Sequence, residues 1–271
     1  MRSLLDQISA SRHTVPMNGS RGAAILEPLQ ELAGASTRLL HSPVLHHSGQ
    51  SIERFIFVGS RGGGDAISIG IFGGIHGDEP AGPHALVKLA RELEQNPSLG
   101  TGYKIFFYPI CNPAGFERGD RFSGNGKDLN REFWKESPEP EVQMLEGEIR
   151  AQRFKGLISL HSDDTSAGLY GFVRGAVLTK SLLEPALTAA QRYLPRNLQN
   201  TIDGFAAHNG IISECYDGIL TSPPRLENSP FEIILETPQH APLEQQVEAM
   251  IAALKSVLAE YQRFLAFAAD I

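Results

Sequence analysis

A short stretch, FGGIHGDEPAG at residues 72–82, contains side chains whose types and spacing could bind a metal ion. His76 and Glu79 lie three positions apart where a run of small and β-branched residues ends, so both can aim at one point. Asp78 is the rival carboxylate, and its position two residues from His76 directs it elsewhere. A catalytic zinc ion takes three ligands from His, Asp or Glu and keeps one position open for water. The alternative is a turn that carries two polar side chains.

A third ligand is expected at the end of another strand. The sequence LISLHSDD, at 157–164, places His161 directly after a buried apolar run. Of the nine histidines, His161 and His76 have this context. His76, Glu79 and His161 are therefore our candidate zinc ligands, with one zinc ion expected per chain.

Basic residues concentrate in the segment NPAGFERGDRFSGNGKDLNREFW, at 112–134 of an otherwise acidic chain. One interpretation is a solvated basic loop. The other is a loop that binds a carboxylate or stabilises an oxyanion, because an Arg side chain presents a planar fork that matches a carboxylate. Its basic residues are Arg118, Arg121, Lys127 and Arg131, and Asn130 beside Arg131 would add a neutral donor.

A candidate general base follows in FEIILETPQ, at 231–239. Metal-assisted hydrolysis needs a carboxylate beside the water that zinc activates. Glu236 lies at the C-terminal end of a predicted strand. Glu232 competes with it, because the two-residue alternation of a strand puts both side chains on one face. The position at the C-terminal end favours Glu236.

Alternating strand and helix patterns predict the elements that position these residues. Strands are predicted at 53–58, 66–72, 104–110, 157–160 and 231–235, with a turn at RGGG (61–64), and helices at 80–94, 141–154, 180–193 and 243–267. Residues 1–50 indicate little beyond a short helix. We expect an α/β fold, with a mixed twisted β-sheet and helices on both faces, as one domain over residues 1–271. The candidate residues then lie at the C-terminal ends of strands, where α/β proteins bind their ligands.

Composition excludes several classes of protein. The 271 residues carry a formal charge of −7, which does not suit a nucleic-acid backbone or an anionic membrane. No apolar run is long enough to span a membrane, and Asp6 interrupts the N-terminal sequence where a secretory signal would be apolar. The two cysteines have no metal-finger spacing. We expect a soluble, cytoplasmic protein, and the sequence leaves its oligomeric state open.

In this order the motifs resemble those of the zinc carboxypeptidase superfamily, which includes murein peptide amidases and the succinylglutamate desuccinylase/aspartoacylase deacylases. The resemblance runs from about Ser51 to the C-terminus. It rests on HGDE at 76–79, NPAG at 112–115, KDLNR at 127–131, LHS at 160–162 and ETPQ at 236–239.

This resemblance implies a role for each candidate residue. His76, Glu79 and His161 would hold zinc, Glu236 would act as general base and then proton donor, and Arg121 would stabilise the oxyanion. Asn130 and Arg131 would bind a substrate carboxylate. Tyr216 is the candidate for the mobile tyrosine of carboxypeptidases by spacing alone, whereas Tyr170 would line the pocket wall.

The resemblance implies a zinc metallopeptidase of the carboxypeptidase type, a hydrolase that cleaves an amide bond beside a free carboxylate. A peptide or acyl amino acid is the expected substrate. An N-acyl amino acid deacylase and a γ-D-glutamyl murein peptide amidase are the alternatives within this chemistry. The single helix expected after Glu236 favours a carboxypeptidase, because the deacylases carry a further β-rich domain there. A catalytically silent, ligand-binding relative is the alternative from another class.

Overall fold

The computed structural model describes residues 20–47, 50–60, 65–175, 179–226 and 229–268. Its helices are α1 (Ala23–Ala35), α2 (Ala81–Gln95), α3 (Pro113–Arg118), α4 (Pro140–Gln152), α5 (Thr179–Ala190) and α6 (Leu243–Ala268), with short 3-10 helices at Pro97–Gly100 and Leu129–Arg131. Its strands are β1 (Leu39–His47), β2 (Gln50–Val58), β3 (Ile67–Phe72), β4 (Tyr103–Tyr108), β5 (Gly156–Asp163), β6 (Tyr170–Gly175), β7 (Thr201–Ile202), β8 (Phe205–His208), β9 (Ile211–Ile212) and β10 (Phe231–Pro238).

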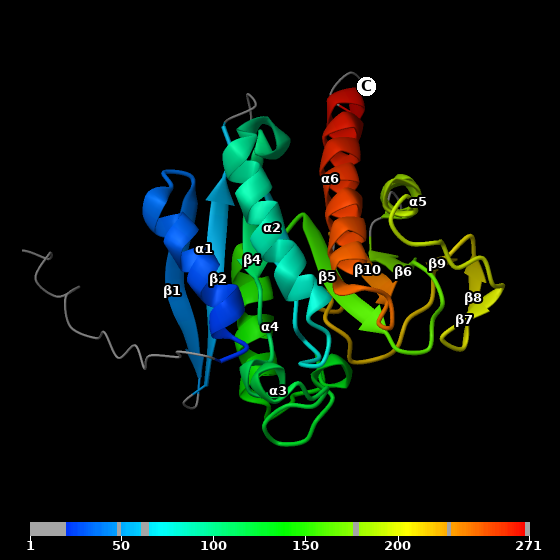
Figure 1. Ribbon diagram of the computed structural model, residues 1–271, viewed down its shortest axis with the longest axis horizontal. Coiled ribbons are helices and arrows are strands. Elements are labelled where there is room, and N and C mark those ends of the chain that lie inside the picture. The colour runs from blue at the N-terminus through cyan, green and yellow to red at the C-terminus, as the bar shows by residue number, and fades with distance from the viewer. Residues whose placement is uncertain (1–19, 48–49, 61–64, 176–178, 227–228, 269–271) are drawn as a thin grey trace, which may run out of the picture.

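The described strands form one mixed sheet in the order β1-β2-β4-β3-β5-β10-β6-β9-β8-β7 (Figure 1). The central strands β4, β3, β5 and β10 run parallel. Antiparallel β1 and β2 extend the sheet at one edge, and antiparallel β6 follows β10 at the other side. A mixed sheet of this kind confirms the predicted α/β fold class.

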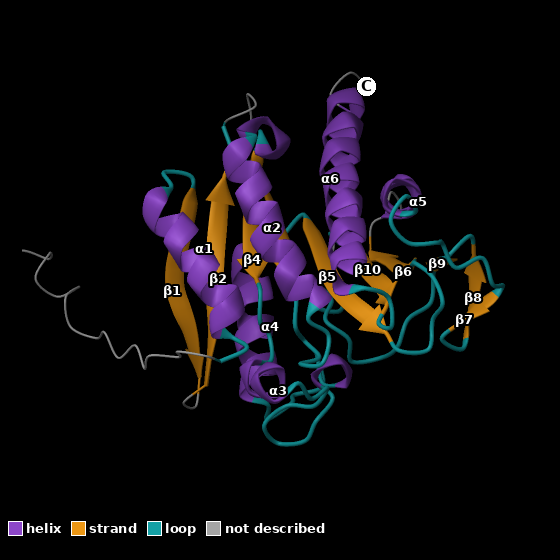
Figure 2. Cartoon of the chain, viewed as in Figure 1, coloured by secondary structure: helices purple, strands orange, loops and turns teal. Residues whose placement is uncertain are grey.

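Helices cover both faces of the sheet. In Figure 2, α1, α2 and α6 cross in front of the strands and α4 lies behind them. The front helices pack in one large apolar core with α5, and α4 packs in a second. Strand β4 shows how the sequence builds both cores: Ile105 and Phe107 enter the first, while Phe106 and Tyr108 enter the second. This alternation follows from the two-residue period of a strand.

The predicted helices and strands agree with the observed ones to within a few residues at each end. The strand predicted at 231–235 continues to Pro238, so Glu236 lies inside β10 and not at its last residue. The strand predicted at 157–160 likewise extends to Asp163. The RGGG turn at 61–64 lies outside the described residues.

Several elements were not predicted. Strand β1 lies in the N-terminal segment, for which the sequence indicated only a short helix, and β6 to β9 lie in the stretch before β10. Strands β7 and β9 each have only two residues, too few for an alternating pattern to show. They form ladder pairs only because the rest of the sheet offers them an edge.

The order of the strands determines where polar side chains converge. After β3 the chain passes through α2 to β4 on one side, whereas β5 pairs with β3 on the other side. The strand order therefore reverses between β3 and β5, and the C-terminal ends of these strands open a crevice there. His76 follows β3 and His161 lies in β5, so both reach this crevice.

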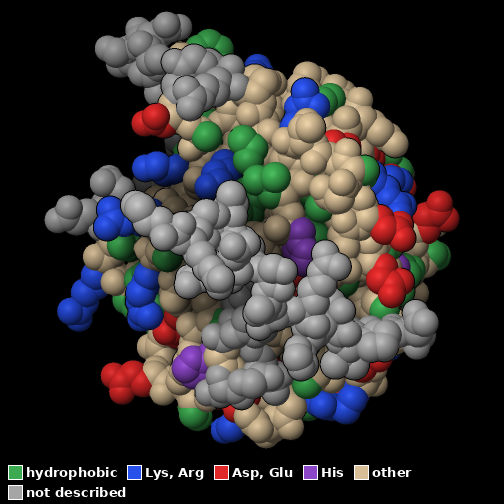
Figure 3. Space-filling view, turned by 90° about the vertical axis from the view of Figure 1, so that its left-hand side faces the viewer, with side chains coloured by type: hydrophobic (Ala, Val, Ile, Leu, Met, Phe, Trp, Pro, Cys, Tyr) green, Lys and Arg blue, Asp and Glu red, His purple; other side chains and the backbone are tan. Residues whose placement is uncertain are grey.

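Charged side chains of both signs lie on the face beside β1, where Figure 3 shows the described Lys and Arg residues interspersed with Asp and Glu.

Among the described residues, none of the helices combines the length and apolar character needed to cross a membrane.

Candidate metal centre

The turn between β3 and α2 brings His76 and Glu79 into the crevice. Gly74 has a φ of 59°, a left-handed conformation that suits glycine. Gly77 lies against the backbone of α3, where an added Cβ would come within 2.0 Å of the Gly115 carbonyl carbon. The glycines of this motif therefore allow a sharp turn and a close backbone approach.

Glu79 connects the two histidines. Its Oε1 lies 2.6 Å from His76 Nδ1, and its Oε2 lies 3.0 Å from His161 Nδ1. The backbone N–H of Ser162 donates to the same Oε2 at 3.0 Å. His76 and Glu79 are each 3% exposed, and His161 is 2% exposed. The structure thus brings together the three predicted ligands, although His76 and His161 lie 85 residues apart in the sequence.

The geometry of these three residues fits a zinc ion. One donor atom from each lies within 4.8 Å of the others, and the Nδ1 atoms of the two histidines are 3.2 Å apart. Zn–N bonds of about 2.0–2.1 Å at a tetrahedral angle separate two donor atoms by roughly 3.3 Å. Two imidazole nitrogens and a carboxylate are also donors that zinc prefers. The donor set therefore fits zinc in both type and spacing.

The carboxylates around His76 favour a positive charge on or beside its ring. Burial opposes protonation of His76, but the carboxylates of Glu79 and Asp128 outweigh it and raise its pKa to about 9. For Glu79, burial likewise opposes the charge, yet the two histidines hold its pKa well below the usual range. A bound cation would satisfy the same carboxylates that otherwise stabilise a proton on His76.

Asp128 is a site residue that the sequence interpretation missed. Its Oδ1 accepts from His76 Nε2 at 3.1 Å, which leaves His76 Nδ1 free to face Glu79 and His161. Its Oδ2 accepts from Arg121 Nε and Nη2 at 3.2 and 3.0 Å. A carboxylate on the outer nitrogen of a ligand histidine orients the ring and raises its basicity. The only sequence signal was the acid within KDLNR.

A buried polar network fixes the end of β5. Ser162 Oγ donates to Gln246 Oε1 at 2.9 Å, and Thr237 Oγ1 donates to the same atom at 3.0 Å. This network ties β5 and β10 to helix α6 directly beside His161. Burial lowers the pKa of His161, and its Nε2 has no partner among the described residues. His161 is therefore held as a neutral imidazole, the form that binds a metal.

Glu236 lies beside His161. The two residues are paired in register on the parallel strands β5 and β10, and Glu236 also pairs with Tyr170 on β6. Burial, together with the carboxylates of Glu79 and Asp163, raises the pKa of Glu236 well above its usual value. Its carboxylate lines the crevice without a hydrogen bond to any described residue. It is therefore free to exchange a proton with a molecule bound there.

The predicted basic loop forms part of the cavity wall. Arg121, Asn130 and Arg131 all line the cavity, and Arg121 Nη1 also lies 3.5 Å from Glu79 Oε1. Asn130 Oδ1 accepts from the backbone N–H of Leu220 at 2.9 Å, which leaves its amide nitrogen for a ligand. The Arg131 guanidinium lies 4.0 Å from the centre of the Tyr216 ring. The loop is thus folded against the site and is not a solvated loop.

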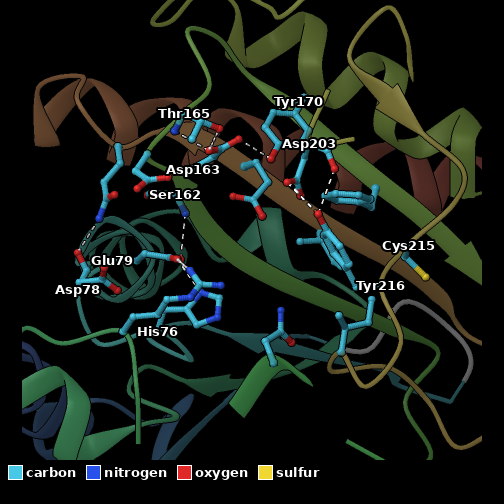
Figure 4. Close-up of a pocket in the computed structure, with 18 of the residues that line it drawn as sticks. His76, Asp78, Glu79, Ser162, Asp163, Thr165, Tyr170, Asp203, Cys215 and Tyr216 are labelled. Carbon is cyan, nitrogen blue, oxygen red and sulfur yellow. Dashed lines mark hydrogen bonds and ion pairs between the residues drawn. The ribbon is translucent and has the colours of Figure 1, made fainter. Parts of the chain in front are cut away.

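The cavity has a volume of about 300 Å³. Figure 4 shows His76 and Glu79 on one side and Tyr216 on the other, with Asp163, Tyr170 and Asp203 between them. Tyr170 lines the wall as predicted, and its hydroxyl donates to Asp163 Oδ2 at 2.8 Å. The hydroxyl of Tyr216 donates to Asp203 Oδ1 at 3.0 Å.

Asp78 also lines this cavity, although the sequence interpretation directed this side chain elsewhere. Two other polar residues lie outside the cavity. His240 lines a separate surface hollow, and the backbone N–H of Ser222 donates to Glu232 Oε1.

Comparisons with known proteins give one family profile and a set of solved structures. Residues 65–175 match the profile of the succinylglutamate desuccinylase/aspartoacylase catalytic domain family, which covers His76, Glu79, Arg121 and His161 but ends before Glu236. A search of curated proteins finds no significant match.

Solved structures share the fold. A protein from Shewanella baltica, provisionally named a metallopeptidase, is 23% identical over 87% of this chain and 90% of its own, with a TM-score of 0.70. A provisionally named metallopeptidase from Shewanella denitrificans is 21% identical over 88% of this chain and 89% of its own, with a TM-score of 0.71. A metallo-carboxypeptidase from Burkholderia cenocepacia is 18% identical over 90% of this chain and 69% of its own, with a TM-score of 0.66.

Proposed function

We propose that the chain is a zinc-dependent hydrolase of the zinc carboxypeptidase-like superfamily, which cleaves an amide bond beside a free carboxylate. The profile match over residues 65–175 and the fold shared with solved metallopeptidase structures support this proposal. The observation that carries this proposal is the convergence of His76, Glu79 and His161 donor atoms at the edge of a cavity that Glu236 also lines. When bound, zinc would polarise the substrate carbonyl and bring the pKa of a coordinated water to about 7.

Glu236 is the group that moves protons in this proposal. It takes a proton from the attacking water and returns it to the leaving nitrogen. Its raised pKa suits a carboxylate that must hold a proton between these two steps. Arg121 donates to the oxygen that becomes negative, from its position between Asp128 and Glu79.

In this proposal, the basic loop binds the acid end of the substrate. The Arg131 guanidinium and the free amide nitrogen of Asn130 both line the cavity, and together they can hold a carboxylate. The stacked Tyr216 ring keeps the Arg131 guanidinium in place. This pair is the reason for proposing a substrate whose amide bond lies next to a free carboxylate.

A carboxypeptidase is our first candidate, because the solved structures with this fold include a metallo-carboxypeptidase. The second candidate is an N-acyl amino acid deacylase, which the profile match over residues 65–175 favours. A γ-D-glutamyl peptide amidase uses the same chemistry on a third kind of substrate.

The first test combines metal content with activity. We expect about one zinc per chain in the native protein and none in the double variant His76→Ala, His161→Ala, measured by plasma mass spectrometry. The variant Glu236→Gln should keep its zinc and lose about 10²–10⁴-fold in kcat on peptides or acyl amino acids. The control variant Glu244→Gln, at an exposed position, should retain both its zinc and its kcat. A native protein that takes up no zinc would refute the hydrolase proposal.

A further inference from the structure

A second, smaller cavity lies behind the apolar wall of the first. Its volume of about 10 Å³ is enough for one water-sized group. The two cavities share part of their lining, namely Phe172, Cys215, Ile219 and Ile234. Figure 4 shows Cys215 on the side of the larger cavity away from His76 and Glu79. A side chain that passes this apolar wall would therefore end in the small cavity.

Glu232 lines this small cavity. It follows the alternation of β10, on the same face as Ile234 and Glu236, and is only 5% exposed. Its Oε1 accepts from the backbone N–H of Ser222 at 2.9 Å and from the Ser222 hydroxyl. Its Oε2 is buried and has no hydrogen-bond partner in the part of the chain that the structure describes.

The nearest cationic side chain among the described residues does not satisfy this oxygen. Arg174 Nε lies 3.6 Å from Glu232 Oε2, which is longer than a hydrogen bond, and the Arg174 side chain is half exposed. Arg174 Nη1 instead donates to Cys215 Sγ at 3.3 Å. A buried acceptor without a donor is costly, so the geometry of Glu232 suits a ligand that brings a donor.

Charge in the larger cavity also disfavours an acidic side chain. Its acidic lining residues outnumber the two arginines, Arg121 and Arg131, and a divalent cation would still leave an excess of negative charge. The acidic residues are Asp78, Glu79, Asp163, Asp164, Asp203 and Glu236. The substrate carboxylate at Arg131 is then best accompanied by a neutral or cationic group.

From these observations we infer that Glu232 selects the substrate side chain, by accepting a hydrogen bond from a nitrogen at its far end. The inference rests on the proposed function and names its substrate class: residues that bear the free carboxylate and a long, unbranched side chain ending in an amide or ammonium group. Four residues at about 3.3 Å per residue separate Glu232 from Glu236 by roughly 13 Å along β10, so a short side chain does not reach.

Matched substrates test this selectivity on the zinc-loaded full chain. The set is acylated dipeptides and N-acetyl amino acids that end in lysine, glutamine, norleucine or glutamate. We expect kcat/KM for lysine or glutamine to exceed that for norleucine by about tenfold or more, with glutamate lowest. A preference for lysine alone identifies an ammonium group as the ligand, and a preference for glutamine alone identifies an amide.

Two variants and a control assign the preference to Glu232. Glu232→Leu should remove it, and Glu232→Gln should reduce the lysine preference more than the glutamine preference. Glu141→Gln is the matched control, because Glu141 is a buried carboxylate that lines neither cavity. Equal kcat/KM for lysine, glutamine and norleucine would overturn the inference and leave the proposed hydrolase intact. No hydrolysis of any compound would refute the proposed function itself.

A binding measurement gives an answer even where a variant fails to fold. Trp134 is the single tryptophan, and its Nε1 donates to the carbonyl of Thr221, which lines the small cavity. Titration of the wild-type protein with lysine, glutamine, norleucine or glutamate should change Trp134 fluorescence. We expect lysine or glutamine to change the fluorescence at concentrations at least tenfold below those that norleucine requires. The same half-maximal concentration for all four compounds would contradict the inference.

Discussion

Glu79 does more at the candidate metal centre than supply one donor atom. Its two oxygens contact both histidines, the Ser162 N–H and, at 3.5 Å, the Arg121 guanidinium. Asp128 also connects two residues of the site, because its carboxylate contacts both His76 Nε2 and the Arg121 guanidinium. Metal ligation and oxyanion stabilisation thus depend on the same two carboxylates in our proposal.

The contact between Asp128 and His76 leads to a prediction about zinc affinity. Asp128→Asn removes the negative charge that orients His76 and holds Arg121, so zinc affinity should fall by about 10–100-fold. Competition with a chromophoric chelator measures the change. Asp120→Asn is the control, because Asp120 lies in the same loop with a side chain that is 47% exposed. Unchanged affinity in Asp128→Asn would show that this hydrogen bond has no role in binding.

At the scale of elements, the candidate centre depends on how closely the β3–α2 turn approaches α3. Gly77 has no room for a Cβ, because the Gly115 carbonyl carbon and the Phe116 nitrogen would lie 2.0 and 2.2 Å from it. Both neighbours are backbone atoms and do not move aside alone. The position of His76 is therefore coupled to the packing of α3.

A pair of glycine variants tests this coupling. Gly77→Ala should destabilise the fold by at least about 1–3 kcal/mol through overpacking. Gly147→Ala should instead stabilise it by about 0.5–1 kcal/mol, because Gly147 lies in α4 with no atom within 4 Å of its added Cβ. Urea denaturation of both variants measures the difference. A Gly77→Ala protein as stable as the wild type would contradict the close approach.

At the scale of the whole molecule, the proposed ligands come from segments that fold together only in the native state. The candidate ligands His76 and His161 lie on either side of the reversal in strand order, between β3 and β5. Zinc that binds only the native state stabilises it by about 2.7 kcal/mol at a free concentration a hundred times Kd. Thermal unfolding is therefore a readout of the assembled site.

This stabilisation should depend on pH. The folded pKa of His76 in the metal-free chain is about 9, above the ordinary value of 6.5. Its proton stabilises the metal-free fold fully below pH 6.5, and this contribution is lost as the pH rises through 9. Zinc must displace that proton, so the zinc-induced rise in Tm should be larger at about pH 8.5 than at about pH 6.5.

Calorimetry at both pH values checks this prediction. The double variant His76→Ala, His161→Ala should show no rise in Tm with zinc at either pH. A rise in the wild type that is larger at the lower pH would show that His76 does not lose a proton when zinc binds.

The sequence by itself determined the α/β fold class and most of the helices and central strands, because apolar periodicity is a local property of the chain. It also singled out His76, Glu79, His161 and Glu236, since each lies in or just after a predicted strand, near its C-terminal end. These residues could be proposed together because such ends meet at one edge of a sheet.

Only the tertiary structure decided which side chains face one another. The contact of Asp128 with His76 spans 52 residues, and the placement of Glu232 behind an apolar wall depends on packing from β6 and from the segment around Ile219. No local pattern encodes such contacts, because they follow from strand order and register. The short strands β7 and β9 also acquire their structure from their neighbours, because two residues carry too little propensity to form a strand alone.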